Sequence, residues 1–219
     1  MNGKTPPPPC IYVIAGPNGG GKSSIVGAML RQTGGDYFNP DTESKRIRVE
    51  NPGVSDPDAN SMAWKLGRRT LERAIRERKT FAFETTLGGH TIPALLEAAV
   101  DRGLQLKMWF ISLSTPELHI QRVHFRVAKG GHDIPEAKIR ERFDRGRVNL
   151  LRLLPKIAEL RLFDNSFEAD PAEGAVPEPL MVLHVQQGRV VQTCDATKIP
   201  IWAKPIVELA MKIDENSQQ

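Results

Sequence analysis

The chain has 219 residues, a formal net charge of +4, 40% hydrophobic and 26% charged residues. This length accommodates one sizeable core, so we expect a single domain with additions rather than two full domains. Its apolar runs fall short of the roughly 20 residues that cross a bilayer, which excludes a membrane-spanning protein. The two cysteines, Cys10 and Cys194, are typical of reduced thiols, and we expect a cytoplasmic location.

The N-terminal stretch contains a proline run followed by the first predicted strand. Residues 1–9 include four consecutive prolines and no apolar segment, so we expect a flexible polyproline II tail and no secretory signal. The β-branched apolar run 11–15 predicts a strand. It leads directly into Gly-Pro-Asn-Gly-Gly-Gly-Lys-Ser at 16–23, a complete Walker A motif.

This motif predicts a nucleotide-binding site. Its glycines let successive backbone N–H groups point at one anion, at a helix N-terminus that favours negative charge. A glycine-rich turn could fit the pattern by accident, but the strand before it and the amphipathic helix after it match the context that the motif requires. We expect Lys22 to contact the β- and γ-phosphates of ATP or GTP, and Ser23 to ligate Mg²⁺. The predicted nucleotide contacts in this loop are Gly16, Pro17, Asn18, Gly19, Gly20, Gly21, Lys22, Ser23 and Ser24.

A second strand is predicted at 36–39, which places Asp41 at the carboxyl end of a strand. Residues 42–57 are polar and contain proline and glycine, and this composition predicts a loop. Asp56 then begins a helix as its N-cap, with Pro57 in the first turn and one apolar stripe along the helix.

The remaining pattern alternates strands with helices. Further strands are predicted at 80–83, 106–113 and 161–164, and helices at 91–102, 115–129 and 135–150. We therefore predict a three-layer α/β P-loop NTPase fold with a mainly parallel, five-stranded sheet in residues 10–168. Residues 169–219 are predicted to add a linker, a β-hairpin (181–185 and 189–193) and a C-terminal helix (205–213), packed on the same domain.

Ligands of an open parallel sheet bind outside the carboxyl ends of its strands, so the side chains that follow the strands converge with the Walker A loop. We expect Asp41 to accept a proton from an attacking hydroxyl, and Glu84 to position the substrate or a Mg²⁺-bound water. The alternative for Asp41 is a turn residue, and the alternative for Glu84 is a polar strand end. The predicted substrate contacts are Asp41, Glu84, Thr85 and Thr86.

An arginine-rich segment predicts a lid around 119–150. From His119 to Arg161, 8 Arg and 3 Lys stand against 5 acidic residues. Arg122 and Arg126 are one helical turn apart, and arginines that close over a γ-phosphate neutralise its developing charge. For each of the later arginines, 140, 142, 145 and 147, a solvated helix face is the simpler interpretation.

Two other classes of site are disfavoured. The long strand 106–113 ends in Ser-Thr instead of the acidic pair that motor ATPases require. The five histidines lack the spacing of a zinc site, so Mg²⁺ with a nucleotide is the only metal that we expect.

Several short motifs together resemble the zeta-toxin superfamily of P-loop kinases, in particular its chromosomal branch of predicted ABC-type ATPases. The resemblance covers residues 11–166 and implies a kinase-like sheet of order 2-3-1-4-5, with ATP or GTP as phosphoryl donor. It implies Asp41 as the base, Glu84 and Thr86 at the substrate, and a nucleotide contact from Asn165. It also implies that Arg122 and Arg126 contact the phosphates. The motifs are the Walker A loop, Phe-Asn-Pro-Asp (38–41), Phe-Glu-Thr-Thr-Leu (83–87), Arg-Val-His-Phe-Arg (122–126), Gly-Gly-His-Asp-Ile-Pro (130–135), Arg-Phe-Asp-Arg with Asn-Leu (149–150), and Asp-Asn-Ser (164–166).

In the toxins that define this family, the acceptor is the 3′-hydroxyl of a UDP-linked N-acetyl amino sugar. This chain has Leu-Gly-Arg-Arg at 66–69, where those toxins carry an acidic substrate contact. An antitoxin protein is a possible partner by resemblance, although the chain contains no recognisable antitoxin segment.

Two alternatives stay open beside a small-molecule kinase. One is a nucleic-acid-associated NTPase, which the scarcity of aromatic residues among the arginines disfavours. The other is a nucleotide-gated binding module without turnover.

Overall fold

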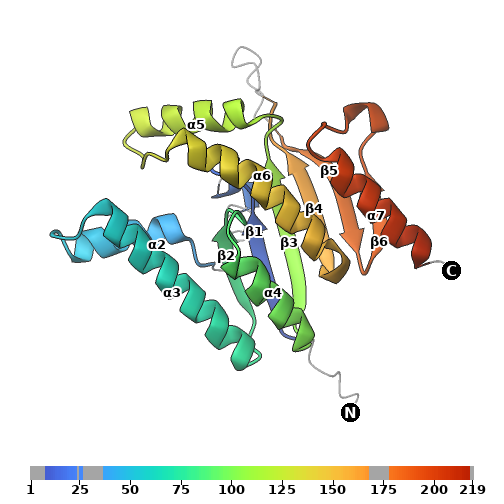
Figure 1. Ribbon diagram of the computed structural model, residues 1–219, viewed down its shortest axis with the longest axis horizontal. Helices are drawn as coiled ribbons and strands as arrows, with labels where there is room; N and C mark the ends of the chain where they lie inside the picture. Colours follow the sequence, from blue (N-terminus) through green and yellow to red (C-terminus); the bar gives the residue numbers. More distant parts are fainter. Residues whose placement is uncertain (1–7, 24, 27–36, 168–177, 218–219) are drawn as a thin grey trace.

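The computed structural model describes residues 8–23, 25–26, 37–167 and 178–217, which contain one six-stranded sheet (Figure 1). The strand order is β2-β1-β3-β4-β5-β6, with parallel pairing from β2 to β4 and antiparallel pairing of β5 and β6. The predicted α/β fold class is confirmed, with six strands instead of five. The strands are β1 Cys10–Ala15, β2 Phe81–Thr85, β3 Gln105–Ser112, β4 Glu159–Asp164, β5 Leu180–Gln186 and β6 Arg189–Thr193.

Local sequence signals begin several of the helices. The side chains of Asn39, Ser55 and Thr115 accept hydrogen bonds from first-turn N–H groups of α2, α3 and α5, and a proline stands in the first turn of each. Ser55, and not the predicted Asp56, is therefore the cap of α3. The helices of the described residues are α2 Pro40–Glu50, α3 Asp56–Arg76, α4 Thr91–Asp101, α5 Pro116–Ala128, α6 Glu136–Leu153 and α7 Lys204–Asn216, with 3₁₀ turns η1 Leu154–Lys156 and η3 Ala196–Lys198.

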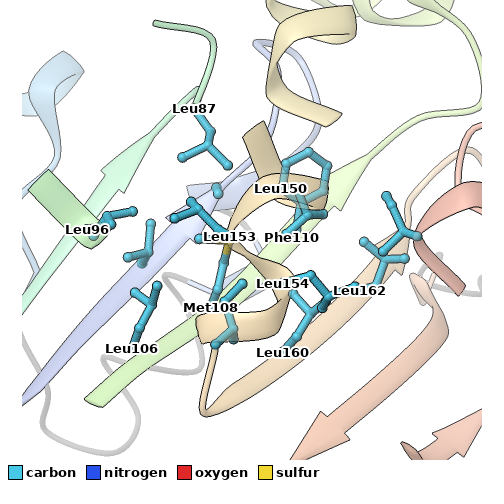
Figure 2. Close-up of a cluster of buried hydrophobic side chains, with 14 of the residues drawn as sticks. Leu87, Leu96, Leu106, Met108, Phe110, Leu150, Leu153, Leu154, Leu160 and Leu162 are labelled. Atoms are coloured by element: carbon cyan, nitrogen blue, oxygen red, sulfur yellow. The ribbon is translucent and has the colours of Figure 1, made fainter. Parts of the chain in front are cut away.

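The main hydrophobic core lies between the sheet and helices α4, α6 and α7, which cover one face (Figure 1). Met108 and Phe110 of β3 point into this core, whereas Trp109 and Ile111 face the other side and pack near Val26 of the segment after the P-loop. Packing on both faces makes the predicted three layers. Figure 2 shows the main core, with Leu87, Leu96, Leu106, Met108, Phe110, Leu150, Leu153, Leu154, Leu160 and Leu162 labelled.

The predicted strand at 36–39 is reduced to a single bridge residue, and residue 36 lies outside the described residues. Phe38 pairs in parallel with Phe83 through two backbone hydrogen bonds of 2.9 Å, to Ala82 and from Glu84. The chain leaves the sheet at once because Asn39 caps α2. This bridge nevertheless lies beside β2, where the expected strand order places it.

The predicted loop at 42–57 is wrong, because helix α2 occupies most of it. Within α2 only Ser44 and Ile47 are buried, and Ile47 packs on Ala59 and Ala63 of α3. A helix with so few apolar residues shows no stripe in the sequence. Consequently Asp41 stands in the first turn of a helix and not at a strand end.

The predicted C-terminal hairpin is confirmed, with Gln187 and Gly188 both at positive φ in a two-residue turn. It does not form a separate unit, since β5 pairs with β4 and thereby extends the main sheet. The predicted linker lies outside the described residues except for residues 178–179, as does most of the predicted tail. Within the described ranges, no helix is both long and apolar enough to traverse a bilayer.

Candidate active site

The Walker A loop forms a backbone cradle directly after β1. Gly16 and Gly21 have φ values of 134° and 84°, which side chains rarely adopt. A Cβ at Gly16 would lie 1.9 Å from the carbonyl oxygen of Ile111, and one at Gly21 would lie 2.5 Å from the Asn165 amide. The loop therefore has room for backbone alone, which fits the close approach of phosphate groups.

The Asn165 side chain holds this loop from the end of β4. Its amide nitrogen donates to the carbonyl oxygen of Gly20 at 3.1 Å, and the backbone carbonyl oxygen of Asn165 accepts from the guanidinium of Arg122 at 2.8 Å. The structure thus places two of the predicted site residues, Asn165 and Arg122, in one chain of contacts with the P-loop.

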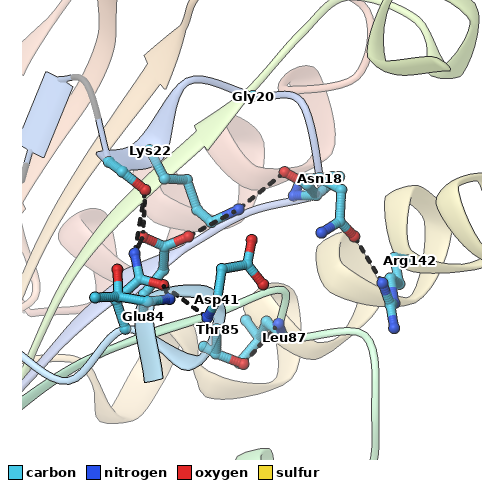
Figure 3. Close-up of polar contacts among 12 residues, drawn as sticks. Asn18, Gly20, Lys22, Asp41, Glu84, Thr85, Leu87 and Arg142 are labelled. Atoms are coloured by element: carbon cyan, nitrogen blue, oxygen red, sulfur yellow. Dashed lines mark hydrogen bonds and ion pairs between the residues drawn. The ribbon is translucent and has the colours of Figure 1, made fainter. Parts of the chain in front are cut away.

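Glu84, at the carboxyl end of β2, lies beside Lys22 and Ser23 of the P-loop (Figure 3). One carboxylate oxygen is 3.5 Å from the Lys22 ammonium, and the other accepts from the Ser23 hydroxyl at 2.8 Å. The Asn39 amide donates to the same oxygen at 3.0 Å. Lys22 is buried and also donates to the Pro17 carbonyl at 3.0 Å. Adjacent hydroxyl and carboxylate oxygens are the ligand types that Mg²⁺ prefers, so Ser23 and Glu84 fit a nucleotide-bound magnesium ion.

Asp41 stands in the first turn of α2, two residues after Asn39, whose side chain donates to Glu84. Its carboxylate is 57% exposed and lies 3.7 Å from the guanidinium of Arg126 on α5. Arg126 also donates to the carbonyl of His132 at 3.1 Å. The contact from α2 to α5 brings together two residues that the sequence analysis assigned to one reaction.

The other predicted substrate residues shape the backbone at the end of β2. The Thr85 hydroxyl accepts from the backbone N–H of Leu87 at 3.1 Å, and Leu87 adopts a φ of +56°. The Thr86 carbonyl lies so close to Gly146 that a Cβ there would approach it to 3.1 Å. Within the described part of the chain neither threonine side chain hydrogen-bonds to the P-loop, and Ser24 lies outside that part.

Arg142 of α6 belongs to the site, although a solvated position was the simpler expectation. Its guanidinium donates to the Asn18 side-chain oxygen at 2.8 Å (Figure 3). Burial lowers the pKa of Arg142, and the Asp41 carboxylate opposes that shift. In contrast, Arg145 and Arg147 pair with acidic residues of their own helix, and Arg140 pairs with Glu117 of α5.

His119 is the functional neighbour that the sequence analysis considered only as a metal ligand. It is completely buried, and its Nδ1 is 2.7 Å from the carbonyl oxygen of Asn18. Its Nε2 accepts from the backbone N–H of Leu113 at 3.0 Å, so the ring is neutral with the proton on Nδ1. Burial lowers the pKa of His119 to about 4. The available signal was the position of His119 on the same face of α5 as the apolar residues Ile120 and Val123, whereas the other histidine of this helix, His124, is exposed.

A pocket of about 370 Å³ opens beside Asp41, between α2, the start of α3 and the end of α5. Asp41 and Arg126 belong both to its wall and to the polar site described above. These two residues therefore connect the pocket to the polar site. It is lined by Asp41, Ser44, Lys45, Arg48, Asp56, Asn60, Phe125, Arg126, Lys129, Gly130, Gly131 and His132.

A protein-family profile described as "AAA domain" matches residues 11–147, more than half of the chain. The chain belongs to this AAA domain family. The AAA domain region contains the P-loop, Asp41, Glu84, the arginines of α5 and the first four arginines of α6, whereas β4, β5, β6 and α7 follow it. An uncharacterised protein of Haemophilus influenzae is 30% identical over 128 residues, which are 58% of this chain and 88% of that protein.

Solved structures share the fold of this AAA domain protein. A crystal structure of AvrRxo1-ORF1:AvrRxo1-ORF2 with sulphate ions has a TM-score of 0.65 at 20% identity, and one with ATP has 0.64 at 19%. They cover 94% and 93% of this chain, which spans 64% of the length of each matched chain. The PezAT chromosomal toxin-antitoxin system of Streptococcus pneumoniae has a TM-score of 0.52 at 14% identity, covering 99% of this chain and 90% of that one. The likenesses show a P-loop kinase-like fold.

Proposed function

We propose that this protein is an ATP- or GTP-dependent phosphotransferase of zeta-toxin type, which transfers the γ-phosphoryl group to a hydroxyl of a small molecule. The observation that supports it best is the position of Asp41. This carboxylate lies on α2, beside a pocket and 3.7 Å from the lid residue Arg126, facing a site that contains a complete P-loop.

On the donor side, the P-loop N–H groups and Lys22 bind the phosphates. In the structure the Lys22 ammonium forms an ion pair with the Glu84 carboxylate and donates a hydrogen bond to the Pro17 carbonyl. When a nucleotide binds, its phosphates would replace Glu84 as the main anionic partner of Lys22. Ser23 and Glu84 would hold Mg²⁺, which when bound neutralises phosphate charge.

On the acceptor side, Asp41 accepts the proton of the attacking hydroxyl. The acceptor oxygen forms a bond to the γ-phosphorus while the bond from that phosphorus to the β–γ bridging oxygen breaks, and the nucleoside diphosphate leaves with the electron pair. The proton on Asp41 then passes to water. Arg122, Arg126 and Arg142 surround this centre from α5 and α6, where cations stabilise the charge of the transferring group.

The proposed acceptor is a UDP-N-acetyl amino sugar or a related nucleotide-linked hydroxyl compound. Four cationic side chains, Lys45, Arg48, Arg126 and Lys129, line the pocket against two carboxylates, Asp41 and Asp56, and this excess of positive charge suits a diphosphate. The segment 66–69 has a structural role instead, since Gly67 packs on the Phe38 ring and Arg68 stacks on Trp64. An antitoxin partner and a cytoplasmic location are part of the same proposal, by resemblance to the zeta toxins.

A mass-spectrometric screen for phosphorylated products tests this function. The protein is incubated with Mg²⁺, ATP or GTP, and a mixture of UDP-sugars and other small hydroxyl compounds. We expect one acceptor to gain a phosphate with the wild-type protein and with Asp144→Asn, a control at an exposed carboxylate of α6. Asp41→Asn should keep nucleotide binding and lose the product, whereas Lys22→Ala should lose nucleotide binding.

Two results would contradict the proposal. Full product formation by Asp41→Asn would refute Asp41 as the base. The absence of any product, together with nucleotide hydrolysis that rises when DNA or RNA is added, would favour a nucleic-acid-associated NTPase.

A further inference from the structure

The backbone carbonyl of Asn18, at the tip of the P-loop, is held by a side chain that lies 101 residues away in the sequence. The Nδ1 of His119 donates to this carbonyl at 2.7 Å. The other ring nitrogen accepts from the N–H of Leu113, at the end of β3. The imidazole therefore connects the P-loop to the strand beside it, and each nitrogen has a partner that suits one neutral tautomer.

The surroundings of His119 leave this ring little freedom. The residue has no exposed surface, and its ring makes an edge contact with Phe143 of α6 at 5.5 Å between centroids. A Cβ at Gly19 would lie 2.6 Å from the carbonyl oxygen of His119, so the loop backbone rests directly on the start of α5. Arg122 follows His119 by less than one helical turn and contacts Asn165, which itself holds Gly20. Helix α5 therefore contacts Asn18 and Gly19 of the P-loop directly. It is also connected to Gly20, because Arg122 of α5 donates to Asn165 and Asn165 donates to Gly20.

We propose that His119 is a positioning residue for nucleotide binding: its Nδ1–H holds the Asn18 carbonyl so that the P-loop amides stay directed at the phosphates. The inference rests on the proposed nucleotide site. The carbonyl oxygen of Asn18 accepts from the imidazole, and this contact keeps the acceptor from turning toward an anion that the loop's N–H groups would bind. The same contact keeps the start of α5, and thus Arg122, in a constant position relative to the loop.

Two substitutions separate the hydrogen bond from the packing. In His119→Asn the amide nitrogen occupies the place of Nδ1 and can still donate to Asn18, but much of the ring volume is lost. In His119→Gln the amide reaches the place of Nε2 and can still accept from Leu113, with no donor left for Asn18. If His119 only fills space, the larger Gln should preserve nucleotide affinity better than Asn. If His119 positions the loop, Asn should preserve nucleotide affinity better than Gln.

The experiment measures nucleotide dissociation constants with a fluorescent ATP analogue, thermal stability, and hydrogen exchange of the amides of residues 18–21 without nucleotide. We expect His119→Gln to weaken nucleotide binding about tenfold, which corresponds to about 1.4 kcal/mol, and to speed amide exchange in the loop. His119→Asn should stay within about twofold of wild type in affinity despite a lower melting temperature. The control Leu96→Ala, at a buried position of α4 in the main core, should lower the melting temperature and leave affinity unchanged.

An affinity order that follows thermal stability, or loop exchange that is unchanged in His119→Gln, would overturn the proposal. The wild-type protein supplies an independent check by NMR, where a proton on Nε2 of His119 instead of Nδ1 would also refute it. None of these readouts needs phosphoryl transfer. A protein that follows the predicted affinity order but phosphorylates no acceptor would contradict the proposed function alone.

Discussion

The buried imidazole of His119 predicts that this protein loses stability in mild acid. Burial, together with the nearby cations Lys22 and Arg122, lowers the pKa of His119 from the ordinary 6.5 to about 4, although the hydrogen bond to the Asn18 carbonyl opposes this shift. A second proton would go to Nε2, which accepts from the Leu113 N–H, so protonation removes that hydrogen bond as well. The folded protein therefore binds a proton at His119 less readily than the unfolded chain does.

The magnitude follows from the difference between these two pKa values. Between pH 6.5 and 4 the unfolded chain binds more protons at this residue than the native chain, so the free energy of unfolding falls as the pH falls. At pH 5 the loss is about 2 kcal/mol, and below pH 4 it approaches about 3 kcal/mol, at 1.36 kcal/mol for each pKa unit. Above pH 6.5 the contribution is fully present and constant.

Urea denaturation at pH 7.5 and pH 5.0 measures this effect when wild type and His119→Gln are compared. Other titrating groups, including the carboxylates, contribute equally to both proteins, so the difference between their pH dependences isolates the imidazole. We expect wild type to lose about 2 kcal/mol more than the variant over this range. Equal losses in the two proteins would show that His119 is not held neutral, and the argument from burial would fail.

Three further substitutions test other parts of the structure. Glu84→Gln removes the carboxylate beside the Ser23 hydroxyl, and we expect the Mg²⁺ concentration for half-maximal transfer to rise about tenfold or more; an unchanged Mg²⁺ titration would exclude the metal role. Gly16→Ala would bring a Cβ to 1.9 Å from a β3 carbonyl and should cost more than about 3 kcal/mol or prevent folding, whereas Gly53→Ala, with open space around it, should stay within about 0.5 kcal/mol by denaturant unfolding. Trp202→Phe deletes the 2.7 Å hydrogen bond to the buried Asp164 and should cost about 1.5–3 kcal/mol, so a melting temperature equal to wild type would contradict that role.

Features that depend on neighbouring residues could be predicted from the amino-acid sequence. The P-loop, the parallel strands, the hairpin and most helices were predicted because glycine spacing, apolar runs and capping residues act within a few positions of one another. Helix α2 was missed because it has one buried apolar residue, Ile47, and this residue is covered only after α3 folds back on it. A local pattern could not show that contact.

The contacts between distant polar residues depend on how the helices pack against the sheet. His119 reaches Asn18 across 101 residues, and Arg142 reaches the same asparagine across 124. In the sequence both resemble ordinary residues of amphipathic helices, since burial depends on the surfaces that pack around a side chain. The roles of Asp41 and Glu84 stay predictions, but their positions around one P-loop follow from strand order and from the turn that begins α2. Such contacts between distant segments form only when the whole sheet folds, so they cannot be predicted from patterns of neighbouring residues.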